Sequence, residues 1–172
     1  LWPAAEYLSE YLQEHLDTFL DPTPPIVLEL GAGLGLSGIY LAFLLQARSP
    51  GTTRVLLTDL AEALDGLTRH IHMNPTKDVD ITAAELPWGD LDRIKTLIPN
   101  HEQNVLVIAA DVVYYEHLFA PLACTLHYLC YEHRATVIIA HIKRWKKDNQ
   151  FFAQLRKRGL HVSVEREEVG FV

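Results

Sequence analysis

Residues 26–35 read Ile-Val-Leu-Glu-Leu-Gly-Ala-Gly-Leu-Gly, and the predicted fold is built outward from them. The first half is a short apolar run, which is typical of a buried parallel strand. The second half places glycines at alternate positions, Gly31, Gly33 and Gly35, where the backbone can turn sharply and approach a ligand. Residues 34–45 follow as a long apolar segment. They predict a helix whose amino-terminal N–H groups point into the same crevice.

Two classes of ligand suit such a turn. Dinucleotide enzymes use the pattern G-x-G-x-x-G and place a pyrophosphate on the helix N-terminus. Here the spacing is G-x-G-x-G and Glu29 precedes it. A carboxylate is a poor neighbour for a pyrophosphate, but it suits a cationic ligand that carries an amino group. The alternatives are an NAD-dependent dehydrogenase and a turn without a ligand.

Apolar β-type runs alternate with segments of helical spacing along the chain. The predicted strands are residues 26–30, 54–59, 79–86, 103–110, 135–140 and 160–165. The predicted helices are residues 3–20, 34–45, 61–73, 91–98, 117–130 and 148–158. This alternation predicts an α/β fold, a doubly wound and mostly parallel sheet with helices on both faces.

Two side chains near strand ends are candidates for a nucleoside site. Asp59 ends the second strand, roughly 20 or more residues after the glycines, where an acid commonly receives a ribose diol. The alternative is that Asp59 caps the following helix. Trp88 follows the third strand and could form the wall of an adenine pocket, or it could close the edge of the core.

Asp111 and Tyr114 follow the most apolar predicted strand. The carboxyl end of a central strand is where open α/β sheets place their active crevice. An acid and a tyrosine at that point can contact a substrate there. The alternatives are a helix N-cap for Asp111 and a half-buried core position for Tyr114.

The composition excludes several other functions. The net charge of −7 disfavours a nucleic-acid-binding surface. No apolar run reaches the ~20 residues that span a bilayer. Two cysteines do not make a disulfide framework, which favours a reducing compartment. His70 and His72 cannot share a helical face, so we predict no metal site. The basic cluster Lys143, Arg144, Lys146 and Lys147 is interpreted as a solvated loop and helix start; the alternative is contact with an acidic target, because the cluster borders the crevice.

Four motifs in this order carry a family resemblance. They are Leu1-Trp-Pro-Ala-Ala5, Glu29-Leu-Gly-Ala-Gly-Leu-Gly35, Glu85-Leu-Pro-Trp-Gly89 and Ala110-Asp-Val-Val-Tyr114. Together they resemble the family 16 protein methyltransferases, which are non-SET, seven-β-strand enzymes that methylate lysines of heat-shock chaperones, elongation factors and a AAA ATPase. The Asp-x-x-Tyr of residues 111–114 is a hallmark of that group.

The resemblance implies a Rossmann-like methyltransferase fold whose last strand is not evident before Val172. We therefore expect residues 1–172 to be a single S-adenosylmethionine-dependent domain that is incomplete at both ends. It also implies a protein substrate such as a chaperone, elongation factor or ATPase. From charge, apolar runs and cysteine content we expect a cytoplasmic or also nuclear monomer that binds neither nucleic acid nor membrane. The remaining alternatives are a methyltransferase for histidine, arginine or a small molecule, and a catalytically silent cofactor-binding module.

The resemblance also assigns roles to residues. Gly31, Ala32 and Gly33 would approach the methionine part of S-adenosylmethionine, with Glu29 near its amino group. Asp59 would accept the ribose hydroxyls and Trp88 would cover the adenine. Trp2 would lie over the cofactor, and Ala110 would touch it through its backbone. Asp111 would accept hydrogen bonds from an incoming amine, and Tyr114 would orient that amine or shape its channel.

Overall fold

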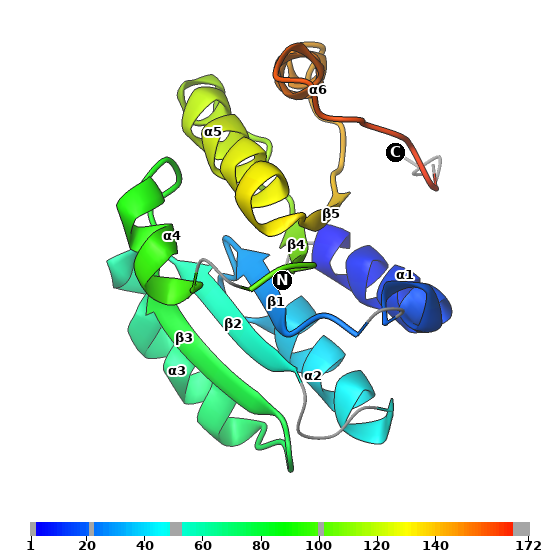
Figure 1. Ribbon diagram of the computed structural model, residues 1–172, viewed down its shortest axis with the longest axis vertical. Coiled ribbons are helices and arrows are strands. Elements are labelled where there is room, and N and C mark those ends of the chain that lie inside the picture. Colours follow the sequence, from blue (N-terminus) through cyan, green and yellow to red (C-terminus); the bar gives the residue numbers. More distant parts are fainter. Residues whose placement is uncertain (1–2, 21–22, 49–52, 100–101, 167–172) are drawn as a thin grey trace.

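A five-stranded, all-parallel sheet with the order β3-β2-β1-β4-β5 forms the centre of the computed structural model (Figure 1). The structure describes residues 3–20, 23–48, 53–99 and 102–166. The strands are β1 (Ile26–Leu30), β2 (Arg54–Asp59), β3 (Asp80–Glu85), β4 (Leu106–Ala110) and β5 (Thr136–Ala140). β1 is buried along its whole length and β4 nearly so, because their uninterrupted apolar sequences suit the centre of a sheet covered on both faces.

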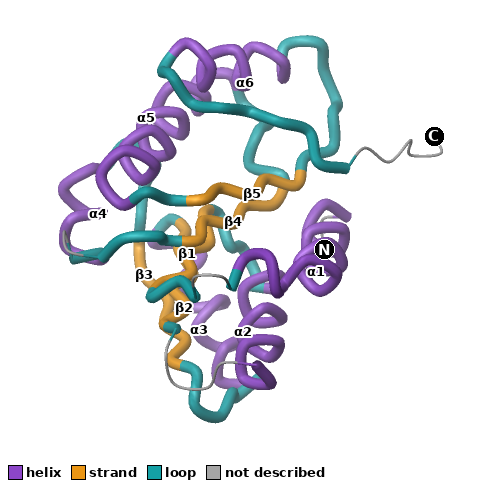
Figure 2. The backbone as a smooth tube through the Cα atoms, turned by 45° about the vertical axis from the view of Figure 1, so that its right-hand side comes forward, coloured by secondary structure: helices purple, strands orange, loops and turns teal. Residues whose placement is uncertain are grey.

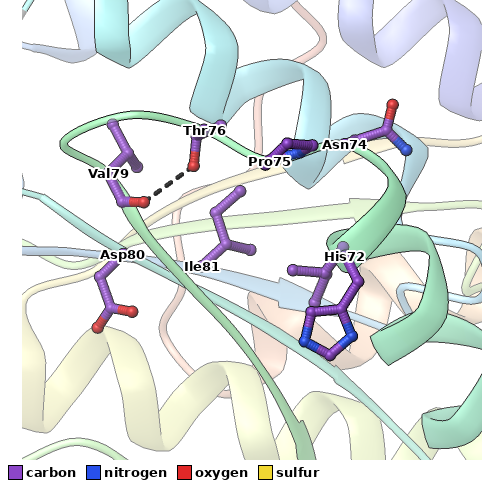
Figure 3. A pocket seen from close by; sticks show the side chains of 8 residues that line it. His72, Asn74, Pro75, Thr76, Val79, Asp80 and Ile81 are labelled. Carbon is purple, nitrogen blue, oxygen red and sulfur yellow. Dashed lines mark hydrogen bonds between the residues drawn. The ribbon is translucent and has the colours of Figure 1, made fainter.

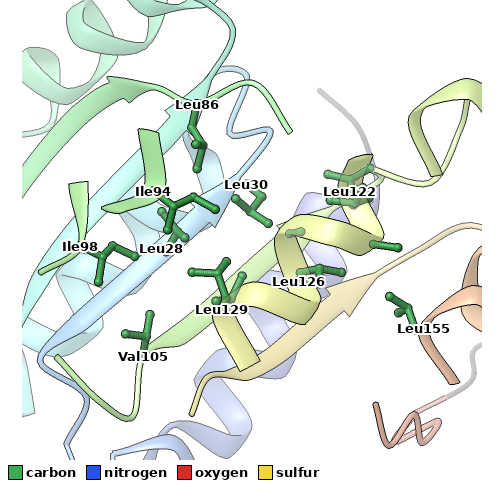
Figure 4. Packing of buried hydrophobic residues seen from close by; sticks show 14 of the residues in the cluster. Leu28, Leu30, Leu86, Ile94, Ile98, Val105, Leu122, Leu126, Leu129 and Leu155 are labelled. Carbon is green, nitrogen blue, oxygen red and sulfur yellow. The ribbon is translucent and has the colours of Figure 1, made fainter. Parts of the chain in front are cut away.

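Helices cover both faces of this sheet, as predicted. They are α1 (Pro3–Phe19), α2 (Leu36–Arg48), α3 (Leu64–Met73), α4 (Leu91–Leu97), α5 (Glu116–His133) and α6 (Asp148–Lys157). Alternate side chains of β1 point to opposite faces. Val27 joins the core cluster that α1, α2 and α3 share. Leu28 and Leu30 pack into the other cluster, with side chains of α4, α5 and α6 (Figure 4).

The topology places a switch point between β1 and β4. The chain passes from β1 to β2 and β3 on one side, and continues through β4 and β5 on the other. In the pairing register, Leu30 lies beside both Thr58 of β2 and Ala109 of β4. The turns that follow these strands therefore emerge together at the carboxyl edge. Such an edge beside a switch point is where open α/β sheets bind ligands.

Two predicted elements differ in the structure. The predicted helix over residues 61–73 begins as a short 3-10 turn, η1 (Ala61–Ala63), before α3. The predicted strand over residues 160–165 is wrong, because this segment forms no ladder with any strand of the described chain. It runs from α6 toward α1 (Figure 2), where Arg166 Nη1 lies 3.0 Å from Glu14 Oε2. An apolar–polar alternation becomes a strand only where a neighbouring strand pairs with its N–H and C=O groups.

None of the helices in the described ranges combines the length and the apolar character that crossing a membrane requires.

Candidate functional site

The glycine turn, residues 31–35, is fastened to the end of β2 by Asp59. All three of its glycines have left-handed backbone angles, with φ of 64°, 55° and 79°. Asp59 Oδ2 accepts the N–H of Gly33 at 2.7 Å, and Asp59 Oδ1 accepts the N–H of Leu60 at 2.7 Å. The N-cap of the following 3-10 turn is Leu60, with no side-chain cap bond. The alternative role of Asp59 as a helix cap is therefore wrong, and its carboxylate fixes the turn instead.

Trp88 lies directly against the glycine turn. A Cβ atom added to Gly31 would come within 3.2 Å of the Trp88 ring and within 3.1 Å of the Val112 side chain. Glycine is therefore needed at this position both for its positive φ and for the close approach of the ring. The half-buried Trp88 also packs on the core that includes α4 and α5. The turn, Asp59 and Trp88 thus meet at one point of the carboxyl edge, although they come from three parts of the chain.

Glu29 points into the layer between β1 and α2. Its side chain is buried, and Oε2 accepts the N–H of Gly38 at 3.0 Å. Burial is the main cause that raises the pKa of Glu29 to about 8; the bond from Gly38 lowers it, and the charge of Asp59 adds to the rise. The carboxyl is therefore largely protonated at neutral pH and anchors α2 behind the turn. Its direct contact with a ligand's amino group stays a prediction.

Ala32 and Ala110 lie at the same edge, and their contact with a cofactor stays a prediction. The N–H of Ala32 donates to the carbonyl of Thr58 at 2.9 Å, which continues the β1–β2 pairing into the turn. Ala110 is the last residue of β4 and lies beside Ala140 of β5. Trp2, the remaining predicted cofactor residue, lies outside the described residues.

Asp111 occupies a strained and buried position after β4. Its φ is 58°, a left-handed conformation that few residues other than glycine, asparagine and aspartate adopt. The N–H of Asp111 donates to the carbonyl of Ala140 at 2.9 Å. Its Oδ2 pairs with the guanidinium of Arg144. α5 begins later, with Tyr115 as N-cap and no side-chain cap bond, so the interpretation of Asp111 as a helix cap is wrong.

Tyr114 links the two halves of the site. Its ring lies 6.3 Å from that of Trp88 in an edge-on arrangement and 4.8 Å from that of Tyr115. The side chain is 37% exposed, so it does not occupy the core position considered as its alternative. Burial first, and then the charge of Asp59, raise the pKa of Tyr114, so its hydroxyl remains protonated at neutral pH.

Three residues that the sequence interpretation did not assign to the site complete the end of β5. Asp148 begins α6, and its Oδ2 accepts the N–H groups of Arg144 and Trp145, each at 3.0 Å. His141 Nε2 lies 3.3 Å from the same oxygen. Burial is the main cause that lowers the pKa of His141. Sequence reasoning grouped Arg144 with Lys143 and Lys146 as one solvated basic loop, so it did not predict the contact between Arg144 and Asp111. Lys143 and Lys146 are indeed exposed.

A separate hollow lies far along the sheet, at the amino end of β3. It has a volume of about 270 Å³, and its walls include His72, Thr76 and Asp80 (Figure 3). Its lining residues in the described chain include none of the predicted site residues. Parallel strands place their amino and carboxyl ends at opposite edges, so this hollow is not part of the candidate site.

Comparisons with known proteins find similarity to lysine methyltransferases. A family model described as lysine methyltransferase matches residues 1–158. The chain is 35% identical to protein N-lysine methyltransferase METTL21A of Danio rerio, over 77% of this chain and 56% of the relative. It is 35% identical to protein-lysine N-methyltransferase EFM6 of Saccharomyces cerevisiae (76% and 55%) and 30% identical to EEF1A lysine methyltransferase 3 of Mus musculus (83% and 56%). The chain thus spans about half the length of these curated relatives.

Solved structures share the fold at low sequence identity. A TDP-rhamnose 3'-O-methyltransferase of calicheamicin biosynthesis superposes with a TM-score of 0.58 at 17% identity, over 84% of this chain and 66% of that one. Magnesium protoporphyrin IX methyltransferase from Synechocystis, with bound SAH, gives 0.55 at 14% identity, over 90% and 61%. The fold is therefore the Rossmann-like methyltransferase fold.

Proposed function

The chain belongs to the lysine methyltransferase family, and from this premise we propose that it transfers a methyl group from S-adenosylmethionine to a lysine side chain of a protein target. One structural observation supports the proposal in addition to family membership. The residues suited to a nucleoside and those suited to an amine converge on the same carboxyl edge of the sheet, and Tyr114 lies between them. We further infer that residues 1–172 belong to one methyltransferase domain.

The residues at the glycine turn fit the cofactor. A carboxylate offers about four lone-pair positions, of which the N–H groups of Gly33 and Leu60 use two at Asp59. The others can accept the two hydroxyls of a ribose. Among the described residues, a Cβ atom added to Gly33 would meet nothing within 4 Å, which supports space for a ligand on this side of the turn. Trp88 offers an aromatic face to an adenine beside it. When bound, the cofactor would supply an electrophilic methyl group on a sulfonium.

The residues at the end of β4 suit the acceptor. A lysine must arrive as a neutral amine, because only the unprotonated nitrogen carries the lone pair that attacks. Asp111 can accept an N–H of that amine and so orient it. Tyr114 and Tyr115 are exposed at 37% and 59%, and their aromatic faces attract cationic side chains of a target.

Relatives narrow the class of target. The name of the mouse relative EEF1A lysine methyltransferase 3 states that it acts on lysine of EEF1A. Among the chaperone, elongation factor and ATPase that the motifs suggest, this name favours an elongation factor. Such a target would place the protein in the cytoplasm, and a chaperone or an ATPase would allow the nucleus as well.

Two measurements test the proposal. Calorimetry should detect binding of S-adenosylhomocysteine and no comparable binding of NAD. Methyl transfer from a tritiated cofactor should then label a degenerate peptide library with one central lysine, and leave matched libraries with central arginine or histidine unlabelled. Binding of NAD in place of S-adenosylhomocysteine would identify a dehydrogenase. Binding of S-adenosylhomocysteine without label on any library would support a silent cofactor-binding module.

A further inference from the structure

The ion pair between Asp111 and Arg144 joins two loops at the carboxyl ends of β4 and β5. We propose that Arg144 is a positioning residue for Asp111. Its guanidinium holds one carboxylate oxygen, so that the other is presented as a hydrogen-bond acceptor to the N–H of the acceptor amine. The inference rests on the proposed function, and it names Arg144 as a residue of the same site that helps to select the acceptor amine.

The first support is the burial of the Asp111 carboxylate. Its side chain is 4% exposed, and its backbone is held by the bond from its N–H to the carbonyl of Ala140. A buried carboxylate needs a charged or hydrogen-bonding partner to compensate for lost hydration. Arg144 supplies that partner at Oδ2 alone. Because the backbone and one oxygen are both fixed, the direction of the second oxygen is fixed as well.

The second support is the state of that second oxygen. Asp111 Oδ1 is buried, and no hydrogen-bond donor reaches it from the part of the chain that the structure describes. Buried polar atoms almost always have a partner, and an exception calls for a reason. At the carboxyl edge of a central strand, a donor that arrives with a substrate is such a reason.

The third support is that Arg144 is itself held in place. The N–H groups of Arg144 and Trp145 both donate to Asp148 Oδ2, and His141 Nε2 lies 3.3 Å from that oxygen. Asp148 is buried at the first residue of α6. This bonding ties the backbone of Arg144 to the scaffold while its side chain extends to Asp111, so the guanidinium is presented to the carboxylate in a fixed arrangement.

The pairing changes what Asp111 offers to a substrate. An aspartate paired with a guanidinium carries little net charge, so it attracts an ammonium ion less than a lone carboxylate does. It remains a directed hydrogen-bond acceptor, and a neutral amine can use it without losing the lone pair that methyl transfer requires. A guanidinium suits this task because its planar fork orients a carboxylate, whereas the ammonium of lysine is a point charge.

A double-mutant cycle tests the inference. The variants are Arg144→Gln, Asp111→Asn and the double variant, with Lys146→Gln as the matched control from the same loop. We expect Arg144→Gln to lower kcat/KM on the lysine peptide library roughly 10- to 100-fold, with the S-adenosylhomocysteine Kd within about twofold. The double variant should be no worse than Asp111→Asn by more than about threefold, because each change removes the same arrangement. Lys146→Gln should match the wild type.

Two further variants protect the test against misfolding. Arg144→Lys keeps a cation and should retain intermediate activity, and Arg144→Ala should regain part of its activity in millimolar methylguanidinium. Arg144 would not position Asp111 if Arg144→Gln behaved like Lys146→Gln, or if the two losses simply added in the double variant. A wild-type chain that bound S-adenosylhomocysteine but labelled no lysine peptide would instead overturn the proposed function, and this inference with it.

Discussion

Asp59 and Asp111 both stand at the carboxyl end of a parallel strand, yet their surroundings differ. The carboxylate of Asp59 accepts two backbone N–H groups, from Gly33 and Leu60, and it fastens the glycine turn. The carboxylate of Asp111 pairs with a side chain that lies 33 residues away, Arg144, and keeps a buried oxygen without a donor from the described residues. The glycine turn is thus organised by backbone groups, and the β4–β5 end (Asp111 and residues 141–148) by side chains.

This difference separates the tasks that we propose for the two regions. Backbone donors fixed by glycines hold their geometry whether or not a ligand is present, which suits a cofactor that every turnover uses. Side-chain pairs can be replaced one residue at a time, which suits recognition of a variable acceptor.

The strongest test concerns Glu29, behind the glycine turn. The pKa of Glu29 is raised from 4.5 to about 8 in the fold, so between these values the unfolded chain ionises while the folded chain keeps its proton. Stability should therefore fall as the pH rises through this window and become level above about pH 8. The Glu29→Gln variant should lack this decrease of stability with pH. Relative to that variant, the wild type should lose roughly 3–4 kcal/mol of unfolding free energy between about pH 5 and about pH 8.

Urea unfolding of both proteins across that pH range measures the difference. Glutamine can still accept the N–H of Gly38 through its amide oxygen, so the comparison isolates the charge. A difference that does not change with pH would mean that Glu29 is ionised in the fold. The region behind the turn would then hold a buried charged side chain. It would no longer differ from the β4–β5 end, where charged side chains organise the structure.

The packing around Gly38 gives the second prediction. A Cβ atom there would lie 2.1 Å from Leu57 Cδ2 and 2.5 Å from Glu29 Oε2, so Gly38→Ala should destabilise the fold by roughly 2–3 kcal/mol. Gly66, in α3, is the control, because a Cβ atom added to it meets no atom of the described chain within 4 Å. Gly66→Ala should be neutral or stabilise by up to about 1 kcal/mol. Equal effects in urea unfolding would contradict the close packing of α2 on β1.

The contrast also explains what the sequence could predict. The strand, the glycines and Glu29 lie within ten consecutive residues, and periodicity with glycine spacing is enough to predict a strand, a turn and a helix there. The central strands β1, β2 and β4 were predictable in the same way, because their apolar runs are buried by helices on both faces. The contact between Arg144 and Asp111 was not, since a basic residue among other basic residues has the pattern of a solvated loop.

The incorrect strand at residues 160–165 has a related cause. Its alternation of apolar and polar residues is a local property, whereas a strand depends on a partner supplied by another part of the chain. Glu29 shows the same limit at the level of one side chain. Its position before the glycines was evident, but its direction toward Gly38 depends on the packing of α2 against β1.

The third prediction returns to Asp59. Asp59→Ala should weaken binding of S-adenosylhomocysteine by about 1–3 kcal/mol, because the ribose hydroxyls lose their acceptor and the N–H of Gly33 loses its partner. Asp59→Asn keeps an acceptor oxygen and should lose less. Calorimetry measures both, with thermal unfolding as the control for folding. Unchanged affinity in a folded Asp59→Ala protein would remove Asp59 from the nucleoside site and leave it only the task of fastening the turn.

The smallest expected effect is that of Tyr114→Phe, at the junction between the two regions. The ring of Tyr114 contacts those of Trp88 and Tyr115, and the residue is partly exposed. If the ring shapes the entrance for the amine, phenylalanine should keep kcat/KM within about threefold, whereas Tyr114→Ala should lose roughly 0.5–1.5 kcal/mol of transition-state stabilisation with the ring contacts. Transfer assays on the lysine peptide library compare the two variants. A phenylalanine variant as impaired as the alanine variant would assign the orienting role to the hydroxyl. Substrate orientation would then depend on two polar groups, the Tyr114 hydroxyl and Oδ1 of Asp111, and not on Asp111 alone.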